Sequence, residues 1–508
     1  MINSILKFSL ILALGMFTIH ADAQDNKIRL KIKGVENQEV YLANYYGEKL
    51  YYNDTTMADA NGYFEFQGKP FEECGKYAVV APGPKFFDII VSQEDIYLET
   101  DTSDLINNLT VHKSDENEQF FNYLHFIQRK RNARAPFDAV LADSLKSDKQ
   151  KEQARAEIKQ LNDDVQQYQK DLIAKHPELL FTKLMQMTLD VEVPEAPEGV
   201  EDAQTWKYYY YRNHYWDRVD FSDPRLVRDQ MFHRVLDKYW TKVLPQIPDS
   251  LLKEAFALVE RADNYDMFKY FTHHITYAAE SSNIMCMDKV FVGMVDRYYR
   301  TGKADWLDEE ATTKILDRAK DLRYTVCGEP VPNIILPDTT LTNWVNLYEI
   351  DSKYTVIAIW ESTCGHCKKE MPKLQELSEE WSDKGLKVFA IGNDFETEPW
   401  VEFIRDKELD GWYHVSDNPA INATDSATKL ISSGITTLLS LNFRSTFDVF
   451  STPKVFLLDE DKRVIAKQLS AEQIGELLKR LEAEDNPTGD VPPAETPKEE
   501  KAVREERG

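Results

Sequence analysis

Two cysteines separated by two residues lie where an apolar, strand-like run gives way to a helical pattern. The run Tyr354-Thr-Val-Ile-Ala-Ile-Trp360 precedes Cys364-Gly-His-Cys367, and helix-forming residues follow from Lys368. A thiolate at the first position of a helix lies against unpaired N–H groups and the positive end of the helix dipole, which lower its pKa and make it nucleophilic. The cysteine one turn later can close a disulfide with it. The motif therefore predicts thiol–disulfide exchange in an α/β domain.

Zinc sites use the same C-x-x-C spacing, so the setting of the motif has to decide between the two chemistries. A structural zinc site would need a second ligand pair, whereas Cys327 and His414 are remote in the sequence and belong to no such pair. A strand-to-helix junction is the setting of redox cysteines. We therefore expect no metal ligands, and exchange between thiols needs no cofactor.

The C-terminal third alternates between strand and helix patterns. Strands are expected at 354–360, 386–391 and 454–458, and helices at about 365–383, 397–408 and 470–484. Ser470 and Gln473 form a capping-box pattern at the start of the last helix. Pro453 stands directly before the third strand, where a proline removes a ladder donor. Either this strand begins at an edge, or a cis bond places the Thr452 backbone beside the cysteines.

Residues from about Cys327 onward resemble the thioredoxin-like redoxins of the TlpA/ResA type. The stretch Trp360-Glu-Ser-Thr-Cys-Gly-His-Cys-Lys-Lys-Glu-Met-Pro372 is similar to that family's strand–CxxC–helix signature, Gly328-Glu-Pro-Val-Pro332 to its leading segment, and Thr452-Pro453 to its cis-proline. The resemblance spans about a third of the chain. It implies a thioredoxin fold for residues 326–484 and favours the cis bond over a simple edge strand.

The resemblance also implies roles for single residues. Cys364 takes the attacking role and Cys367 the resolving role. Glu370 aligns with an acid that lies close to the cysteines in such proteins, where it could move protons or tune the pair; the alternative is a solvated charge on the helix. The residues expected to bind the substrate are Trp360, Gly365, His366, Thr452 and Pro453.

Two differences from related proteins limit the chemistry. Thioredoxins proper bury an aspartate in the strand before the motif, whereas this strand carries Ala358, so a buried proton acceptor would have to be Glu361 or Glu370. Peroxiredoxins carry Thr or Ser three residues before the nucleophile and Pro seven before it, where this chain has Glu361 and Ile357. Peroxidase activity is therefore not expected. The Gly-His dipeptide, seen in protein disulfide isomerases, favours the Cys364 thiolate but leaves the direction of exchange open.

The beginning of the chain has the pattern of a secretory signal peptide. Lys7 supplies a positive charge, residues 8–19 form an apolar stretch, and Ala21-Asp-Ala23 is a small-residue cleavage site. The apolar run is too short to span a membrane. We therefore expect residues 1–23 to be removed and the protein to act in the periplasm.

The other segments differ in pattern from the C-terminal third. Residues 24–112 contain alternating runs separated by turn residues, which predicts an antiparallel β domain. Residues 113–325 have apolar spacing near 3.6 and predict an all-α domain, with a long exposed helix or hairpin arm at 142–175. Residues 485–508 carry four prolines among charges and are expected to be disordered. The layout resembles long periplasmic redoxins, whose front domains have no activity to carry over.

The chain is strongly acidic, with 87 acidic and 61 basic residues and a formal net charge of −26. Such a surface is a poor partner for nucleic acid and for an anionic membrane. The expected partners are protein thiols and disulfides, with a membrane-embedded thiol as a further electron donor.

Three cysteines and one aromatic run lie outside the redox motif. Cys286 and Cys327 could pair, or could be two buried thiols, because the sequence does not show their separation. Cys74 has no obvious partner. The aromatic run at 206–216 could be a stacking platform, but aromatic residues at helical spacing more often belong to the core, and we favour the core.

Together these patterns predict a multidomain periplasmic thiol–disulfide oxidoreductase. It combines an N-terminal antiparallel β domain, an all-α middle domain and a C-terminal α/β thioredoxin fold. A disulfide isomerase is one alternative. The other is a binding or assembly module with an accessory redoxin domain, against which the intact Cys364, Cys367 and Thr452-Pro453 argue.

Overall fold

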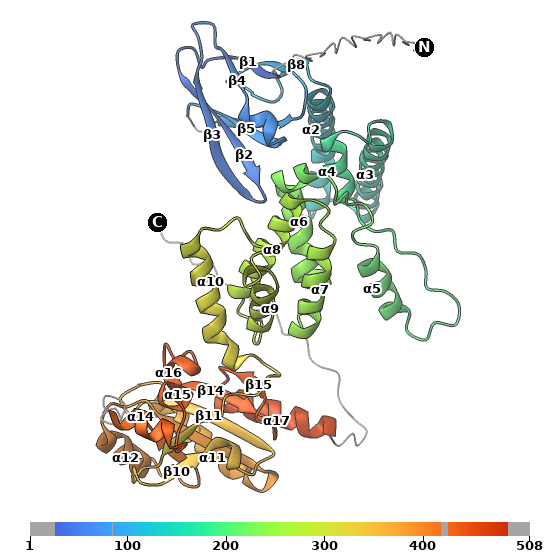
Figure 1. Ribbon diagram of the computed structural model, residues 1–508. Coiled ribbons are helices and arrows are strands. Elements are labelled where there is room, and N and C mark those ends of the chain that lie inside the picture. Colours follow the sequence, from blue (N-terminus) through green and yellow to red (C-terminus); the bar gives the residue numbers. More distant parts are fainter. Residues whose placement is uncertain (1–25, 84, 418–424, 486–508) are drawn as a thin grey trace, which may run out of the picture. The chain divides into compact units, whose positions relative to one another are not determined.

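The structure, a computed structural model, describes residues 26–83, 85–417 and 425–485 (Figure 1). The predicted signal peptide lies outside these residues, as does the predicted tail beyond residue 485. The chain divides into two compact units. The first comprises the chain up to Pro245 together with Arg261–Tyr270, and the second comprises Gln246–Glu260 together with the chain from Phe271 onward.

Two four-stranded sheets form the N-terminal part of the first unit. The strands are β1 (Lys27–Lys33), β2 (Glu39–Tyr46), β3 (Lys49–Met57), β4 (Tyr63–Gln67), β5 (Gly75–Ala81), β6 (Lys85–Val91), β7 (Ile96–Asp101) and β8 (Thr110–Lys113). Their orders are β4-β1-β7-β8 and β3-β2-β5-β6. β1 buries Ile28, Leu30 and Ile32, as the two-residue period of a strand requires. The predicted β domain is confirmed, with one parallel pairing, between β1 and β7.

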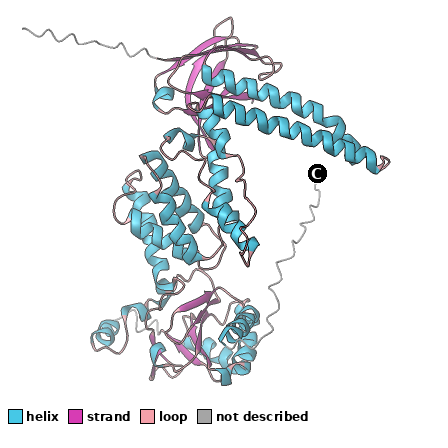
Figure 2. Ribbon diagram, turned by 90° about the vertical axis from the view of Figure 1, so that its right-hand side faces the viewer, coloured by secondary structure: helices cyan, strands magenta, loops and turns pink. Residues whose placement is uncertain are grey.

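A long helical hairpin follows the sheets. Its helices, α2 (Asp115–Ala142) and α3 (Asp148–Lys175), pack side by side (Figure 2). At the base, the Asn117 amide accepts the N–H of Ile90 over 2.9 Å and donates to the Ile90 carbonyl over 2.7 Å. At the tip, Leu145 is 92% exposed. The arm expected at 142–175 therefore corresponds to α3, and α2 is its partner.

The first unit also contains four shorter α-helices: α1 (Lys69–Glu72), α4 (Leu180–Met187), α5 (Ala203–Asn213) and α6 (Gln230–Lys238). α5 carries most of the aromatic run, and it buries none of its residues. Trp216, beyond the end of the helix, is buried, whereas Tyr209 is 51% exposed. The expectation that this run forms core is therefore wrong for most of its length, because α5 lies at the surface.

The second unit begins with the remaining helices of the middle segment. They are α7 (Pro248–Glu260), α8 (Tyr265–Glu280, in this unit from Phe271), α9 (Asp288–Met294) and α10 (Glu309–Leu322). α7 buries Leu251, Ala255 and Leu258, which recur on one face at helical spacing. The predicted helical segment is confirmed as helical, and its residues are shared between the two units.

A five-stranded sheet forms the core of the C-terminal third, in the order β13-β12-β11-β14-β15. Its strands are β11 (Tyr354–Trp360), β12 (Leu386–Gly392), β13 (Tyr413–Ser416), β14 (Lys454–Leu458) and β15 (Val464–Lys467); β9 (Ile335–Pro337) pairs separately with β10 (Trp344–Asn346). β11 pairs in parallel with β12 and antiparallel with β14. All seven residues of β11 are buried, which explains a continuous apolar run in place of alternation. The predicted thioredoxin-like α/β fold is confirmed.

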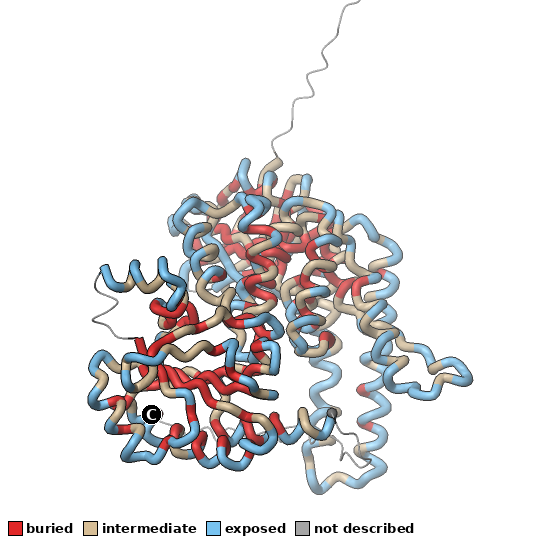
Figure 3. The backbone as a smooth tube through the Cα atoms, turned by 60° about the horizontal axis from the view of Figure 1, so that its bottom comes forward, coloured by how far each residue is buried: buried red, intermediate tan, exposed pale blue. Residues whose placement is uncertain are grey.

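Helices cover both faces of this sheet, and the buried residues follow its strands (Figure 3). One face packs against α11 (Cys367–Glu380), α12 (Thr397–Asp406) and α17 (Ala471–Asp485), and the other against α14 (Asp425–Ser432), α15 (Leu438–Leu441) and α16 (Phe443–Thr446). Cys367 lies in the first of these two cores, beside the strand residues Ala358 and Trp360. Among the described residues, no helix combines the length and the apolar character that a membrane crossing requires.

Candidate active site

The redox motif lies in the turn between β11 and α11. The sequence predicts Cys364 at the first position of the helix. In the structure the helix begins at Cys367, so Cys364 lies three residues before it. The turn already follows the helical hydrogen-bond pattern, because the N–H of Lys368 donates to the Cys364 carbonyl over 3.1 Å. The Cys367 amide donates to the Cys364 Sγ over 3.3 Å. The sulfur therefore still meets an N–H group of the helix start, which is the contact that activates a thiolate.

The two sulfurs lie in different environments. Partial burial acts to raise the pKa of Cys364, but hydrogen bonds from Cys367 outweigh it, and the pKa is lowered from that of an ordinary thiol. Burial, reinforced by the hydrogen bond with Cys364, raises the pKa of Cys367 to about 12. Cys367 is completely buried, whereas Cys364 is partly exposed. Of the two sulfurs, Cys364 is therefore the accessible one and the one whose surroundings favour the thiolate.

Thr452 and Pro453 lie beside the cysteines, with Thr452 88 residues further along the chain than Cys364. The bond between them is cis, which confirms this prediction. The Cys364 thiol donates to the Thr452 carbonyl over 3.2 Å. Both Thr452 and Pro453 are partly exposed, so their backbone lies at the surface next to the attacking sulfur.

The other residues expected to bind the substrate fall into two groups. Gly365 and His366 are exposed beside Cys364, and a Cβ added at Gly365 would meet no atom within 4 Å. Trp360 is completely buried and packs against Phe403, with ring centroids 4.9 Å apart. This placement corrects the expectation for Trp360, because no part of its ring is open to a substrate. Trp360 instead belongs to the buried core that contains Cys367 and against which Cys364 packs.

Glu370 connects the motif helix to the last helix. Its Oε1 accepts the N–H of Ala471 over 2.5 Å, at the start of α17. The predicted capping box is confirmed there, because the Gln473 side chain accepts the N–H of Ser470 over 2.9 Å and the Ser470 hydroxyl accepts the N–H of Gln473 over 3.3 Å. A carboxylate at a helix N-terminus stabilises the helix. Glu370 is thus a partly buried positioning group and not a freely solvated charge.

Asn393 and Asp394 also belong to the site, although the sequence analysis did not identify them. They follow β12, and they contact the two residues after β11: Asn393 donates to the Glu361 carboxylate, and Asp394 accepts the N–H of Ser362 over 3.1 Å. Neighbouring parallel strands end at the same edge of a sheet. Polar residues directly after the strand expected at 386–391 could therefore have been predicted to lie near the cysteine motif. Their contacts fix the turn that carries Cys364.

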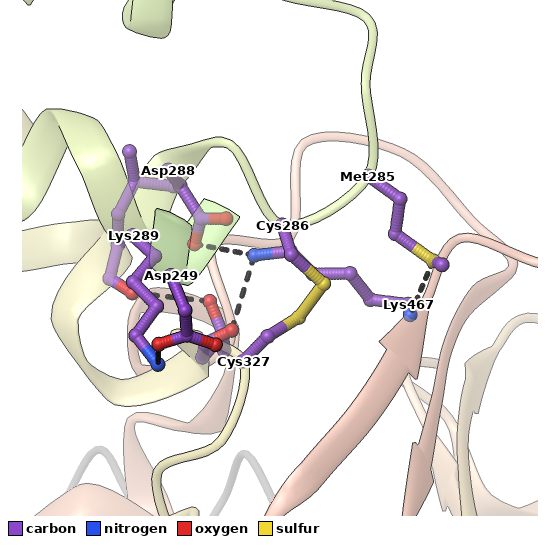
Figure 4. The surroundings of a disulfide bond; sticks show 9 residues. Asp249, Met285, Cys286, Asp288, Lys289, Cys327 and Lys467 are labelled. Carbon is purple, nitrogen blue, oxygen red and sulfur yellow. Dashed lines mark hydrogen bonds and ion pairs between the residues drawn. A yellow bond between two sulfur atoms is a disulfide. The ribbon is translucent and has the colours of Figure 1, made fainter. Parts of the chain in front are cut away.

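A second cysteine pair lies in the same unit. Cys286, before α9, forms a disulfide with Cys327, and their Cα atoms are 5.5 Å apart (Figure 4). The sequence left this pairing open, and the structure shows it. Nearby, the Lys467 ammonium of β15 donates to Asp288 over 2.5 Å, and the Lys467 N–H donates to the Met285 sulfur over 3.4 Å. The disulfide and these bonds join the helical segment to the redoxin segment.

The residues considered as zinc ligands are engaged elsewhere. Cys327 belongs to the disulfide, and the His414 ring bonds to the Leu409 carbonyl over 2.7 Å. Burial lowers the pKa of His414. Within the described parts of the chain, no group of three or more His, Cys, Asp or Glu side chains is arranged to hold a metal ion.

Sequence comparisons match three successive parts of the chain. The family described as Redoxin matches residues 327–483, and the domains of unknown function DUF4369 and DUF5106 match residues 26–120 and 145–325. The thiol-disulfide oxidoreductase ResA of a Bacillus cereus strain is 30% identical over 152 residues, which cover 30% of this chain and 73% of that protein. ResA of Oceanobacillus iheyensis is 26% identical over 87 residues, which cover 17% of this chain and 41% of that protein.

Solved structures are similar to parts of the chain. A domain of a "possible thiol-disulfide isomerase" from Cytophaga hutchinsonii is 32% identical, with a TM-score of 0.26, and the match covers 32% of this chain and 97% of that one. A thioredoxin-like protein from Bacteroides caccae is 17% identical, with a TM-score of 0.40, and the match covers 58% of this chain and 99% of that one.

Proposed function

Because the chain belongs to the TlpA/ResA-type thioredoxin-like redoxins and is a thiol–disulfide oxidoreductase, we propose that it exchanges disulfides with proteins through Cys364 and Cys367. The inequality of the two thiols carries the proposal. Cys364 is partly exposed and has a lowered pKa, whereas Cys367 is buried and its pKa is raised to about 12. An exposed thiolate can attack and a shielded thiol can resolve, so this order supports the attacking role of Cys364 and the resolving role of Cys367.

In the reducing direction, the Cys364 thiolate attacks one sulfur of a substrate disulfide. A mixed disulfide forms, and the other substrate sulfur leaves as a thiolate that takes up a proton. Cys367 then loses its proton and attacks the Cys364 sulfur, which releases the second substrate thiol. Two electrons have passed to the substrate, and the enzyme holds a Cys364–Cys367 disulfide.

We propose that the substrate chain lies against the exposed surface around Cys364. Gly365, His366, Thr452 and Pro453 form this surface, and the backbone of Thr452 is already at hydrogen-bond distance from the sulfur. Glu370 acts as a positioning residue, because its carboxylate holds α17 against the motif helix. The Gly-His dipeptide is compatible with an isomerase, which would use the same first attack.

We propose that this exchange takes place in the periplasm. The charged, apolar and small-residue pattern of residues 1–23 supports export. Oxidised Cys364 and Cys367 need two electrons from a further dithiol, and a membrane-embedded thiol donor would supply them. Residues 24–112, 113–325 and 326–484 are the proposed domains.

Insulin reduction with dithiothreitol as the electron source tests the proposed activity. We expect the wild-type protein to accelerate the reaction and the Cys364→Ser variant to lose this acceleration, because the attacking sulfur is gone. Hydrogen peroxide should be a poor substrate for both. Equal insulin reduction by the two proteins would end the oxidoreductase assignment to this pair and favour the binding module.

A further inference from the structure

A cavity of about 650 Å³ opens beside the redox motif. Residues of the motif turn and of α11 line it, together with Pro453 and with Arg318 of α10. Pro453 follows Thr452, whose carbonyl accepts the Cys364 thiol, and His366 lies two residues after Cys364, so the cavity is lined by close neighbours of the attacking cysteine. A polypeptide that presents a cysteine to Cys364 therefore has its neighbouring residues within reach of this cavity.

Positive charge dominates the lining. Four cations and two carboxylates contribute to it: Arg318, Lys369, Lys373 and Lys454, and Asp448 and Glu370. Both carboxylates are engaged, Asp448 by Arg318 over 2.7 Å and Glu370 by the N–H of Ala471. The chain as a whole has a net charge of −26, so a positive cavity at the redox motif is a local exception.

Two of the cations are open to an incoming anion. Lys369 and Lys373 are exposed and four residues apart, so they lie on the same face of α11. Among the described residues, neither forms an ion pair, whereas many other lysines of the chain do. Two exposed ammonium groups near a reactive sulfur, neither of them within ion-pair distance of a carboxylate among the described residues, favour an anionic partner.

The helical segment contributes Arg318 to the lining of the cavity. The Arg318 guanidinium bonds to Asp448 and lies 5.8 Å from the ring centroid of Phe450, which is 85% exposed. The Cys286–Cys327 disulfide holds this segment against the redoxin segment. The lining of the cavity therefore combines an ion-paired cation, an exposed aromatic ring and two exposed lysines.

We propose that this cavity binds an acidic segment of the partner protein, next to the cysteine that reacts with Cys364. The inference rests on the proposed function and adds the class of substrate to it. Aspartate or glutamate side chains would pair with Lys369 and Lys373, and an apolar neighbour would cover Phe450. The middle helical segment, through Arg318, thereby takes part in selecting the substrate.

The test compares three disulfide-linked peptides that differ only in the residues flanking the cysteine: Asp/Glu, Asn/Gln or Lys. Reduced full-length protein is mixed with each peptide, and kcat/KM is measured at low and at high salt. We expect about a tenfold preference for the acidic over the neutral peptide at low salt, since each neutralised charge at an exposed site changes the rate about threefold. High salt should remove the preference, because it screens charges beyond a few ångströms.

Three variants locate the preference. Lys369→Gln with Lys373→Gln should lose it, and Arg318→Gln should reduce it about threefold. Lys368→Gln is the matched control, because Lys368 is an exposed lysine of the same helix that does not line the cavity. All variants should reduce the neutral peptide at the wild-type rate. The rate with the neutral peptide distinguishes the proposed exchange activity from the proposed acidic preference, since failure of the wild-type protein on every peptide would overturn the exchange activity itself.

Three outcomes would overturn the inference alone. The first is equal kcat/KM of the wild-type protein for the three peptides. The second is an acidic preference that Lys368→Gln removes as completely as the cavity variants do. The preference would then come from the general positive charge around Cys364 and not from the cavity. The third is a charge-dependent reaction with glutathione disulfide but not with the peptides, which would assign the cavity to a small carboxylate-bearing disulfide.

Discussion

The second unit contains two cysteine pairs that share one chemistry and differ in what surrounds them. Cys286 and Cys327 are 41 residues apart, both buried, and joined by a disulfide between the helical and the redoxin segments. Cys364 and Cys367 are three residues apart, and both thiols are free. One of this second pair is partly exposed, and the other is completely buried.

The difference links the proposed reactivity to the inequality of the two thiols of a pair. Cys364 receives an amide hydrogen bond at a helix start and lies against a neighbouring backbone carbonyl, whereas Cys367 lies in the core under the sheet. Cys286 and Cys327 have nearly the same exposure, 9% and 8%, so neither is presented to an external disulfide. Thiol–disulfide exchange requires access for the attacking sulfur, and only Cys364 has it.

The largest expected difference between the pairs concerns turnover. Cys367→Ser should slow insulin reduction by at least about tenfold, because only external dithiothreitol can then resolve the mixed disulfide, and without dithiothreitol it should trap covalent complexes. Cys327→Ser is the matched control and should trap none through Cys364. Non-reducing gels and mass spectrometry of captured proteins measure the difference. Comparable trapping by the two variants would show that the second pair also reacts.

The second prediction concerns stability. Replacing both Cys286 and Cys327 by Ser should lower the free energy of unfolding of the second unit by about 4 kcal/mol, the entropy of closing a loop of 41 residues. Urea unfolding followed by tryptophan fluorescence measures this change. The rate at which this variant reduces the neutral disulfide-linked peptide should change little, because the residues around Cys364 are unchanged. A loss below about 1 kcal/mol would show that other contacts already hold the helical segment in place.

The third prediction concerns reactivity and its pH dependence. Iodoacetamide should label Cys364 at least about thirtyfold faster than Cys367 near pH 7, because the pKa of Cys364 is lowered whereas that of Cys367 is raised to about 12, and this difference outweighs the lower nucleophilicity of the more acidic thiol. Labelling of Cys364 should rise with pH to a midpoint below the usual thiol value of 9.0, since its pKa is lowered. Peptide mapping measures both rates. Faster labelling of Cys367 would reverse the proposed roles.

The smallest expected effect belongs to Glu370. Glu370→Ala should lower the free energy of unfolding by about 1 kcal/mol, because the first N–H groups of α17 lose an acceptor. Glu370→Gln should restore about half of this loss, since it keeps a neutral acceptor. Turnover should fall less than about threefold in both variants, with the pH dependence of Cys364 labelling unchanged. A shifted pH profile in Glu370→Gln would instead assign proton transfer to this carboxylate.

The sequence predicted the elements that carry the strongest local signal. The bounds of β11 and β14 agree with the expected 354–360 and 454–458, because both strands are buried on both faces and read as unbroken apolar runs. The cis bond at Pro453 followed from a proline at a strand start together with the family resemblance. The capping box at Ser470 followed from residue types at fixed spacing.

Features that depend on tertiary contacts could not be predicted in the same way. β3 was not expected because most of its side chains are exposed and its pattern does not alternate. Trp360 is expected to bind the substrate because it directly precedes the motif in the sequence, whereas the fold buries its ring in the core. The contacts of Asp394 with Ser362 and of Glu370 with Ala471 join elements 32 and 101 residues apart, and no local pattern encodes such a pairing.

The hairpin of α2 and α3 has a mechanical consequence for the first unit. A helix of 28 residues is about 42 Å long, so a rotation of about 10° at its base moves its tip by about 7 Å. Two side chains attach the base of the hairpin to the rest of the unit. Asn117 forms hydrogen bonds with the Ile90 backbone, and Glu116 accepts the N–H of Phe181 over 2.6 Å. Burial raises the pKa of Glu116 to about 6. The base of the hairpin, where a small rotation moves the tip most, therefore contains a carboxyl group that gains its proton in mildly acidic surroundings.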